Sequence, residues 1–205
     1  MNILLDLLPE TVEIGAVEYP INTDFRISIL FELMMQDSSL SDKEKMQEAI
    51  RLYYPEIPHD LEEAVEKLIW FYRCGKVEKV KKNVASQEEE EEEDTQERRV
   101  YSFEYDDRYI YAAFLSDYGI DLQDVEGLHW WKFRAMFIAL NDSCEFKKIM
   151  GYRSMKITSK MSKEQRAFYE KMQRIHALPI PDDEQEKYDA ITKALMGDGD
   201  LTGLL

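Results

Sequence analysis

Glycine, proline and cysteine are all scarce in this sequence. Its 205 residues include eight Gly, six Pro and two Cys. All-β folds need many turns, which glycine and proline usually supply, so their scarcity favours helices. The two cysteines, Cys74 and Cys144, lie far apart in the sequence. They predict neither a disulfide framework nor a zinc site, and we expect both thiols to be reduced.

Signals of export and of nucleotide binding are also missing. No Lys or Arg precedes Arg26 and no small-residue cleavage site follows the N-terminal segment, so we expect no signal peptide. No apolar stretch is long enough to span a bilayer. The sequence contains neither G-x-x-x-x-G-K-[ST] nor G-x-G-x-x-G. We therefore expect a soluble, intracellular protein without a phosphate-binding loop.

Negative charge dominates, but it is unevenly distributed. The net charge of −16 argues against a general nucleic-acid binder, because phosphate contacts need cations. Residues 88–97 hold eight acidic side chains and no basic one, whereas residues 147–174 hold nine Lys or Arg against two Glu. The acidic run has no apolar residue to offset the entropy lost on ordering, which predicts a disordered linker. The alternative is a segment that pairs with the basic stretch or guards a binding face.

The acidic run divides the chain into two predicted units within a mainly α fold. Residues 1–84 are expected to form a short β-hairpin followed by helices, residues 85–99 the acidic disordered linker, and residues 100–158 a second small helical bundle. A basic amphipathic helix over 159–178, and a marginal helix with a flexible tail over 179–205, complete the prediction. Hydrophobic residues make up 44% of the sequence, which is enough to build a core.

Capping and turn residues locate the individual elements. Alternation of apolar and polar residues on both sides of Gly15 predicts the hairpin. Three helices are expected after it: 24–35 with Thr23 as N-cap, 41–54 with Ser41 and Glu44 as a capping box, and 59–75 with Asp60 at its start and Gly75 at its end. Four more are expected later: 109–118 ended by Gly119, one running from a cap at Asp121 or Asp124 to Leu140, 142–153, and 162–178 with Ser162 and Gln165 as a capping box.

The most unusual stretch is "LHWWKFRAMFIAL", residues 128–140. On a helix, with about 100° between successive residues, Trp130 and Trp131 fall on different sides and almost every position is apolar. A helix of this kind packs on its own unit and on a second surface. Burial of two Trp could contribute about 7–12 kcal/mol, which is typical of a core or an interface rather than a catalytic centre. We expect one Trp in the core of the second unit and the other at its edge or in an interface.

No catalytic, metal or cofactor site is predicted. His129 has no second histidine nearby, so we expect a neighbouring group to satisfy it, and a base–nucleophile pair with Cys144 has no local support. Asp121, Glu145 and Lys147 could form a nuclease-like set, but such sets normally lie on a small β-sheet and this region is predicted to be helical. The acidic run lacks the glycine turn and the ligand spacing of a Ca²⁺ loop.

The second unit resembles a known family. The stretch "YSFEYDDRYIYAAFLSDYGIDLQDVEGLHWWKFRAMFIAL", followed by "FKKIMGYRSMKI", is similar to the gene-product-fifteen family of long-tailed bacteriophages and prophages of Gram-positive bacteria. The spacing from "YGIDL" to "LHWWKF" is the most specific feature, and the resemblance covers roughly residues 1–178. In such phages the gene typically lies between those for the major tail protein and the tape measure.

That gene position implies a tail-assembly chaperone. Such a protein would coat the tape-measure protein, keep it soluble and help recruit tail-tube subunits in the host bacterial cytoplasm, without catalysis and without entering the virion. Its expected partners are the tape measure, the major tail protein, a second tail chaperone and further copies of itself, with no nucleic acid and no membrane. The residues expected to bind partners are Trp130, Trp131, Phe133, Phe137 and Tyr152.

The composition fits that role. Ten Met supply adaptable contact surface, and two helical units on an acidic tether suit two partners, or many copies along one filament. Two rival functions remain open from the sequence. The first is an acidic inhibitor that mimics nucleic acid and blocks a host DNA enzyme, supported by net charge and the phage context. The second is a metal-dependent nuclease.

Overall fold

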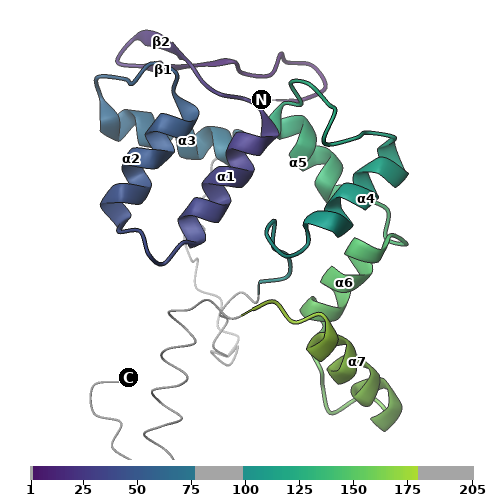
Figure 1. The fold of residues 1–205 in the computed structure, drawn as a ribbon. Coiled ribbons are helices and arrows are strands. Elements are labelled where there is room, and N and C mark those ends of the chain that lie inside the picture. Colours follow the sequence, from purple (N-terminus) through teal and green to yellow (C-terminus); the bar gives the residue numbers. More distant parts are fainter. Residues whose placement is uncertain (1, 77–98, 180–205) are drawn as a thin grey trace, which may run out of the picture.

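The computed structural model describes residues 2–76 and 99–179 and is mainly helical (Figure 1). The first segment contains a β-hairpin and three helices: β1 (Thr11–Ile14), β2 (Val17–Pro20), α1 (Phe25–Gln36), α2 (Asp42–Tyr53) and α3 (Leu61–Tyr72). The second contains four helices: α4 (Asp107–Tyr118), α5 (Trp130–Ile138), α6 (Glu145–Ser154) and α7 (Lys163–Ile175). The predicted fold class is confirmed. The predicted linker 85–99 and the predicted tail 179–205 lie outside the described residues, except for residues 99 and 179.

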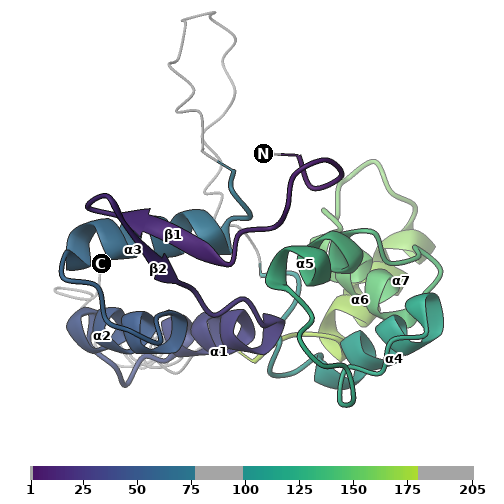
Figure 2. The ribbon, with the colours of Figure 1, turned by 90° about the horizontal axis from the view of Figure 1, so that it is seen from above.

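The hairpin lies across α3 and buries one face of β1 (Figure 2). Ile14 pairs with Val17 in the antiparallel register, which leaves a two-residue loop. Gly15 and Ala16 in that loop have φ angles of 57° and 61°. Two consecutive positive φ values are typical of a type I′ turn, whose twist matches that of the strands. Val12 and Ile14 point toward α3 and are buried, which is the alternation that the sequence predicts.

Local capping signals confirm several predicted helix ends. Ser41 and Glu44 exchange their capping-box hydrogen bonds at the start of α2, and Ser162 and Gln165 do the same at the start of α7. The carboxylate of Asp60 accepts the Glu63 N–H at the start of α3. Gly119 adopts the left-handed conformation and ends α4. The residue types alone specify these two ends.

The predicted starts of α1 and α5 are wrong, for one shared reason. Helix α1 is capped by Asp24 instead of Thr23, and α5 begins only at Trp130, well after Asp121 and Asp124. The Thr23 carbonyl accepts the Trp130 N–H at 2.7 Å, and the Phe25 N–H donates to the Leu128 carbonyl at 2.9 Å. This short antiparallel pairing keeps both backbone segments extended up to the first residue of each helix, so neither helix can start earlier.

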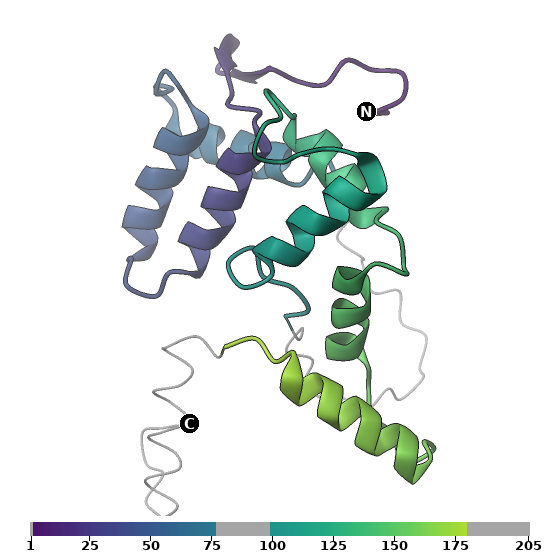
Figure 3. The ribbon, with the colours of Figure 1, turned by 45° about the vertical axis from the view of Figure 1, so that its right-hand side comes forward.

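A single hydrophobic core contains residues from both described segments. Phe133 of α5 is fully buried and stacks on Phe25 of α1 and on Phe114 of α4, with ring centroids 4.8 Å apart in each case. Figure 3 shows α5 beside α1, with α7 packed on α6 away from the hairpin. The residues on the two sides of the acidic run therefore fold against one another, and the predicted domain boundaries stay a prediction. None of the helices in the described ranges has the length and apolar character needed to cross a bilayer.

Candidate functional site

The aromatic residues of α5 pack against the end of α3. Trp130 is fully buried; its ring stacks on Tyr72 with centroids 5.5 Å apart, and its indole N–H donates to the Tyr72 carbonyl at 2.8 Å. Trp131 is also buried, contacts Trp70 and Phe71, and donates its indole N–H to the Phe71 carbonyl at 2.8 Å. The last carbonyls of a helix lack partners within the helix. The two adjacent indoles therefore cap α3 from outside.

The residues predicted to bind a partner are thus mostly internal. Phe133 and Phe137 are buried with the two tryptophans, while Tyr152 is half-buried between α6 and α7, where its ring contacts Phe168. The second surface predicted for α5 is provided by α3 of the same chain. Partner binding by these five residues stays a prediction.

His129 has a structural position at the start of α5. Its Nδ1 accepts the Trp131 N–H at 3.0 Å, so the ring proton lies on Nε2, which donates to the Pro9 carbonyl at 3.1 Å. Burial lowers the pKa of His129 and favours this neutral form. Both ring nitrogens are occupied, which confirms the expectation that neighbouring groups satisfy this histidine.

A buried ion pair joins the segment before α4 to α6. The guanidinium of Arg153 meets the carboxylate of Asp106 through two hydrogen bonds, of 2.6 and 2.9 Å, and the two residues are 9% and 1% exposed. Arg153 also donates to the carbonyls of His176 and Val100, and Asp106 accepts the Ser102 N–H. Four parts of the second segment are therefore held at one buried point. The sequence gives no signal for this pair.

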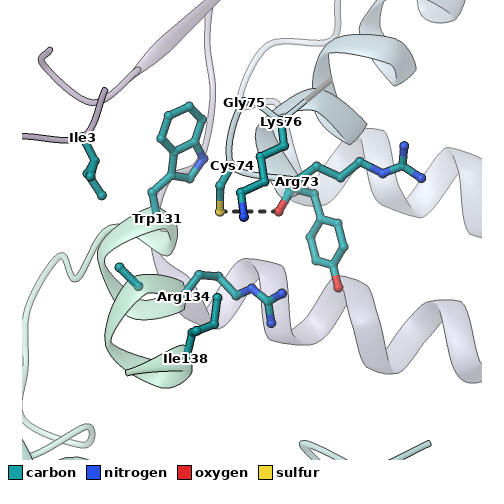
Figure 4. A pocket seen from close by; sticks show the side chains of 10 residues that line it. Ile3, Arg73, Cys74, Gly75, Lys76, Trp131, Arg134 and Ile138 are labelled. Carbon is teal, nitrogen blue, oxygen red and sulfur yellow. Dashed lines mark hydrogen bonds between the residues drawn. The ribbon is translucent and has the colours of Figure 1, made fainter. Parts of the chain in front are cut away.

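A basic pocket of about 510 Å³ lies between the end of α3 and α5 (Figure 4). Three cations, Arg73, Lys76 and Arg134, line it together with Trp131 and several apolar side chains; of the described residues in its wall, none is acidic. Burial raises the pKa of the Cys74 thiol, while Arg134 and Lys76 act in the opposite direction. Both positive charges therefore act on the same wall residue, Cys74.

Gly75 in the wall of this pocket gives a matched test of packing. Its φ is +70° and an added Cβ would lie 2.8 Å from the Trp131 ring, whereas Gly119 has a φ of +64° and open space around it. Gly119→Ala is expected to cost about 1 kcal/mol of stability from backbone strain alone. Gly75→Ala is expected to cost roughly 1–3 kcal/mol more, because the Trp131 ring must shift. Urea denaturation of both variants measures the difference, and equal losses would show that the contact with Trp131 is loose.

An apolar groove of about 340 Å³ opens between α1, α2 and α3. Met35 of α1, Met46 of α2 and Ile69 of α3 line it and are 46%, 45% and 39% exposed. Phe31 and Leu68 form its floor and are buried. The groove is thus a partly exposed extension of the core of the first segment. The sequence indicates methionine-rich contact surface but not its position.

The nuclease-like set has a structural explanation for each member. Glu145 forms an ion pair with Lys148, Lys147 donates to the Ile138 carbonyl, and Asp121 accepts the Gln123 N–H. The two strands of the described sheet lie in the hairpin, away from these residues. Within residues 2–76 and 99–179, no group of three His, Cys, Asp or Glu side chains is arranged to hold a metal ion.

Comparison with known protein families gives a match over most of the chain. The family model described as Bacteriophage Gp15 protein matches residues 4–178. No curated protein and no solved structure matches the chain. The matched range includes both described segments and the acidic run between them, and it confirms the family resemblance seen in the sequence.

Proposed function

Because this chain belongs to the bacteriophage Gp15 protein family, we propose that it is a tail-assembly chaperone that binds the tape-measure protein and helps the tail tube assemble. A tape measure is a long, apolar, helix-rich protein, which aggregates unless its apolar faces are covered. A protein that keeps it soluble needs an apolar groove on a strongly charged body, and it needs no catalytic group. The proposed place of action is the host bacterial cytoplasm, with release before the virion is complete.

The apolar groove between α1, α2 and α3 is the observation that carries this proposal. An amphipathic helix binds such a groove by inserting apolar side chains spaced three or four residues apart. Each buried Leu or Ile contributes about 1.5–3 kcal/mol, so two or three insertions give useful affinity. The flexible side chains of Met35 and Met46 adapt to different sequences, which suits a partner with many unlike helical segments.

The exterior charge supports the same role. With a net charge of −16, copies bound along one filament repel neighbouring complexes and stay in solution. The major tail protein, a second tail chaperone and further copies of this chain are proposed as additional partners. The aromatic residues of α5 would serve this function from inside, by holding α3 and hence one wall of the groove.

The test is co-expression of the chain with the tape-measure protein of the same phage. The soluble tape measure is expected to require this chain, and the double variant Met46→Glu/Ile69→Glu is expected to lower its recovery at least about tenfold, because each carboxylate would be buried in an apolar contact. Both side chains are partly exposed, so the variant should keep the wild-type circular dichroism spectrum. Gln47→Glu, at an exposed neighbouring position on α2, is the matched control.

Two results would refute the proposal: a tape measure that stays soluble alone, or a groove variant that protects it as well as the wild type does. Deleting residues 88–97 separates this proposal from an acidic mimic of nucleic acid. The deletion should abolish inhibition of a DNA enzyme by a mimic, whereas it should reduce tape-measure solubility only mildly.

A further inference from the structure

We propose that the basic pocket between α3 and α5 binds an acidic, leucine-rich segment of a partner protein. The carboxylates of the partner segment would pair with Lys76 and Arg134. Its apolar side chains would cover Ile3, Ile138 and the exposed leucines that follow Ile3 in the sequence. The inference does not depend on the tail-assembly role, since it concerns a different surface from the groove between α1, α2 and α3.

Charge gives the first argument. The chain has 42 acidic and 26 basic residues, yet this pocket brings Lys76 and Arg134 together and has no carboxylate among its described wall residues. Figure 4 shows Lys76 extending toward Cys74 on one wall, with Arg134 of α5 on the facing wall. Two like charges in a partly enclosed pocket repel one another, and an anion between them removes that cost. The pocket therefore selects a negatively charged group.

The carboxylate of Glu32 does not provide that anion within the wall. Glu32 lies on α1 and accepts the Tyr72 hydroxyl at 2.6 Å. Glu32 and Arg134 both act on the hydroxyls of Tyr72 and Tyr101, and Glu32 is not among the described residues of the pocket wall. The guanidinium of Arg134 also lies over the Trp130 ring, at 5.5 Å from its centroid, so its position is fixed by packing. A fixed guanidinium binds a carboxylate with little loss of side-chain freedom.

Apolar exposure gives the second, independent argument. Ile3 lines the pocket, and next to it in the chain Leu4, Leu5 and Leu7 are 88%, 82% and 93% exposed. Ile138 on the opposite wall is also exposed. Three nearly bare leucines within four residues form an apolar strip of the kind that marks an interaction surface. A ligand that covers this strip and pairs with the cations must be both apolar and acidic.

The same features disfavour other anionic ligands. Nucleic acid and anionic membranes carry many charges, and a chain with a net charge of −16 repels both. A short peptide carries few charges and supplies leucines that match the exposed strip. A volume of about 510 Å³ accommodates a few side chains, which is the size of a peptide anchor site.

The experiment measures fluorescence anisotropy of labelled synthetic peptides with the full-length chain. The probes are a twelve-residue peptide of alternating Glu and Leu, a matching peptide of alternating Lys and Leu, and a leucine-free peptide with the sequence of residues 88–97. The Glu–Leu peptide is expected to bind at least about tenfold more tightly than either of the others. Its affinity should fall as salt rises from about 50 to 300 mM, because the charge pairs are screened.

Variants assign the binding to the pocket. Lys76→Gln/Arg134→Gln is expected to weaken binding of the Glu–Leu peptide at least about tenfold, and Lys76→Gln alone, at an exposed position that leaves the core intact, about threefold. Lys132→Gln, an exposed lysine of α5 outside the pocket, should leave binding unchanged. Equal binding of all three probes, or a Lys76→Gln variant that binds like the wild type, would overturn the proposal.

Discussion

Trp130→Ala is expected to lower the free energy of unfolding by about 3–5 kcal/mol. The side chain is fully buried between Tyr72 and Phe133, so its removal leaves a large cavity where the two described segments meet. The Tyr72 carbonyl also loses its indole donor. Because small domains are stable by only about 5–15 kcal/mol, this loss is a large part of the total. Urea denaturation followed by far-ultraviolet circular dichroism measures it.

Trp70→Ala is the control for this prediction. Trp70 is half-buried and touches Trp131 from the outside of the junction, so its loss is expected to cost roughly 1–2 kcal/mol. From the helical wheel alone, one of the two variants Trp130→Ala and Trp131→Ala is expected to unfold. The other is expected to stay folded but to bind its partner less well. Since both side chains are buried, we now expect Trp131→Ala to lose stability too. A Trp130→Ala variant no less stable than Trp70→Ala would contradict the central position of Trp130.

Arg153→Met is expected to cost about 3–5 kcal/mol, an effect as large as the loss of Trp130. The substitution leaves the Asp106 carboxylate buried without its cation, and it also removes donors from the carbonyls of Val100 and His176. Asp106→Asn should be destabilising for the complementary reason, because the guanidinium then has no counter-charge. Denaturation curves of the full-length variants provide the measurement.

A double-mutant cycle decides whether the ion pair itself is responsible. Asp106→Asn/Arg153→Met should cost less than the sum of the two single variants, because neither buried charge remains uncompensated. The exposed pair Arg51–Glu48 on α2 is the comparison, and Arg51→Ala should cost no more than about 1 kcal/mol. Additive losses in the cycle would mean that Asp106 and Arg153 act separately.

Helix ends that depend on neighbouring residues could be predicted from the sequence, and those that depend on distant residues could not. The capping box of Ser41 and Glu44 and the left-handed Gly119 act within a few positions, so the residue types are sufficient. The start of α5 depends on pairing between Trp130 and Thr23, which lie more than a hundred positions apart. Nothing near Trp130 in the sequence records that contact.

The candidate sites divide in the same way. The aromatic stretch around Trp130 is visible as an apolar helix that needs two surfaces, but the sequence does not indicate that α3 is the second one. Lys76 and Arg134 stand in separate segments, and only the packing of α5 on α3 brings their charges into one pocket. The pairing of Asp106 with Arg153 could not be predicted from the sequence, because a buried ion pair is defined by burial and distance.

The junction between α3 and α5 also sets an order for folding during synthesis. The carbonyls of Phe71 and Tyr72 accept the indole N–H groups of Trp131 and Trp130. At typical elongation rates the ribosome adds these tryptophans about 3–12 s after α3. Until then Trp70 and Tyr72 at the end of α3 lack their contacts with the tryptophans of α5. Premature termination before Trp130 is therefore expected to release a fragment whose uncovered aromatic side chains favour aggregation.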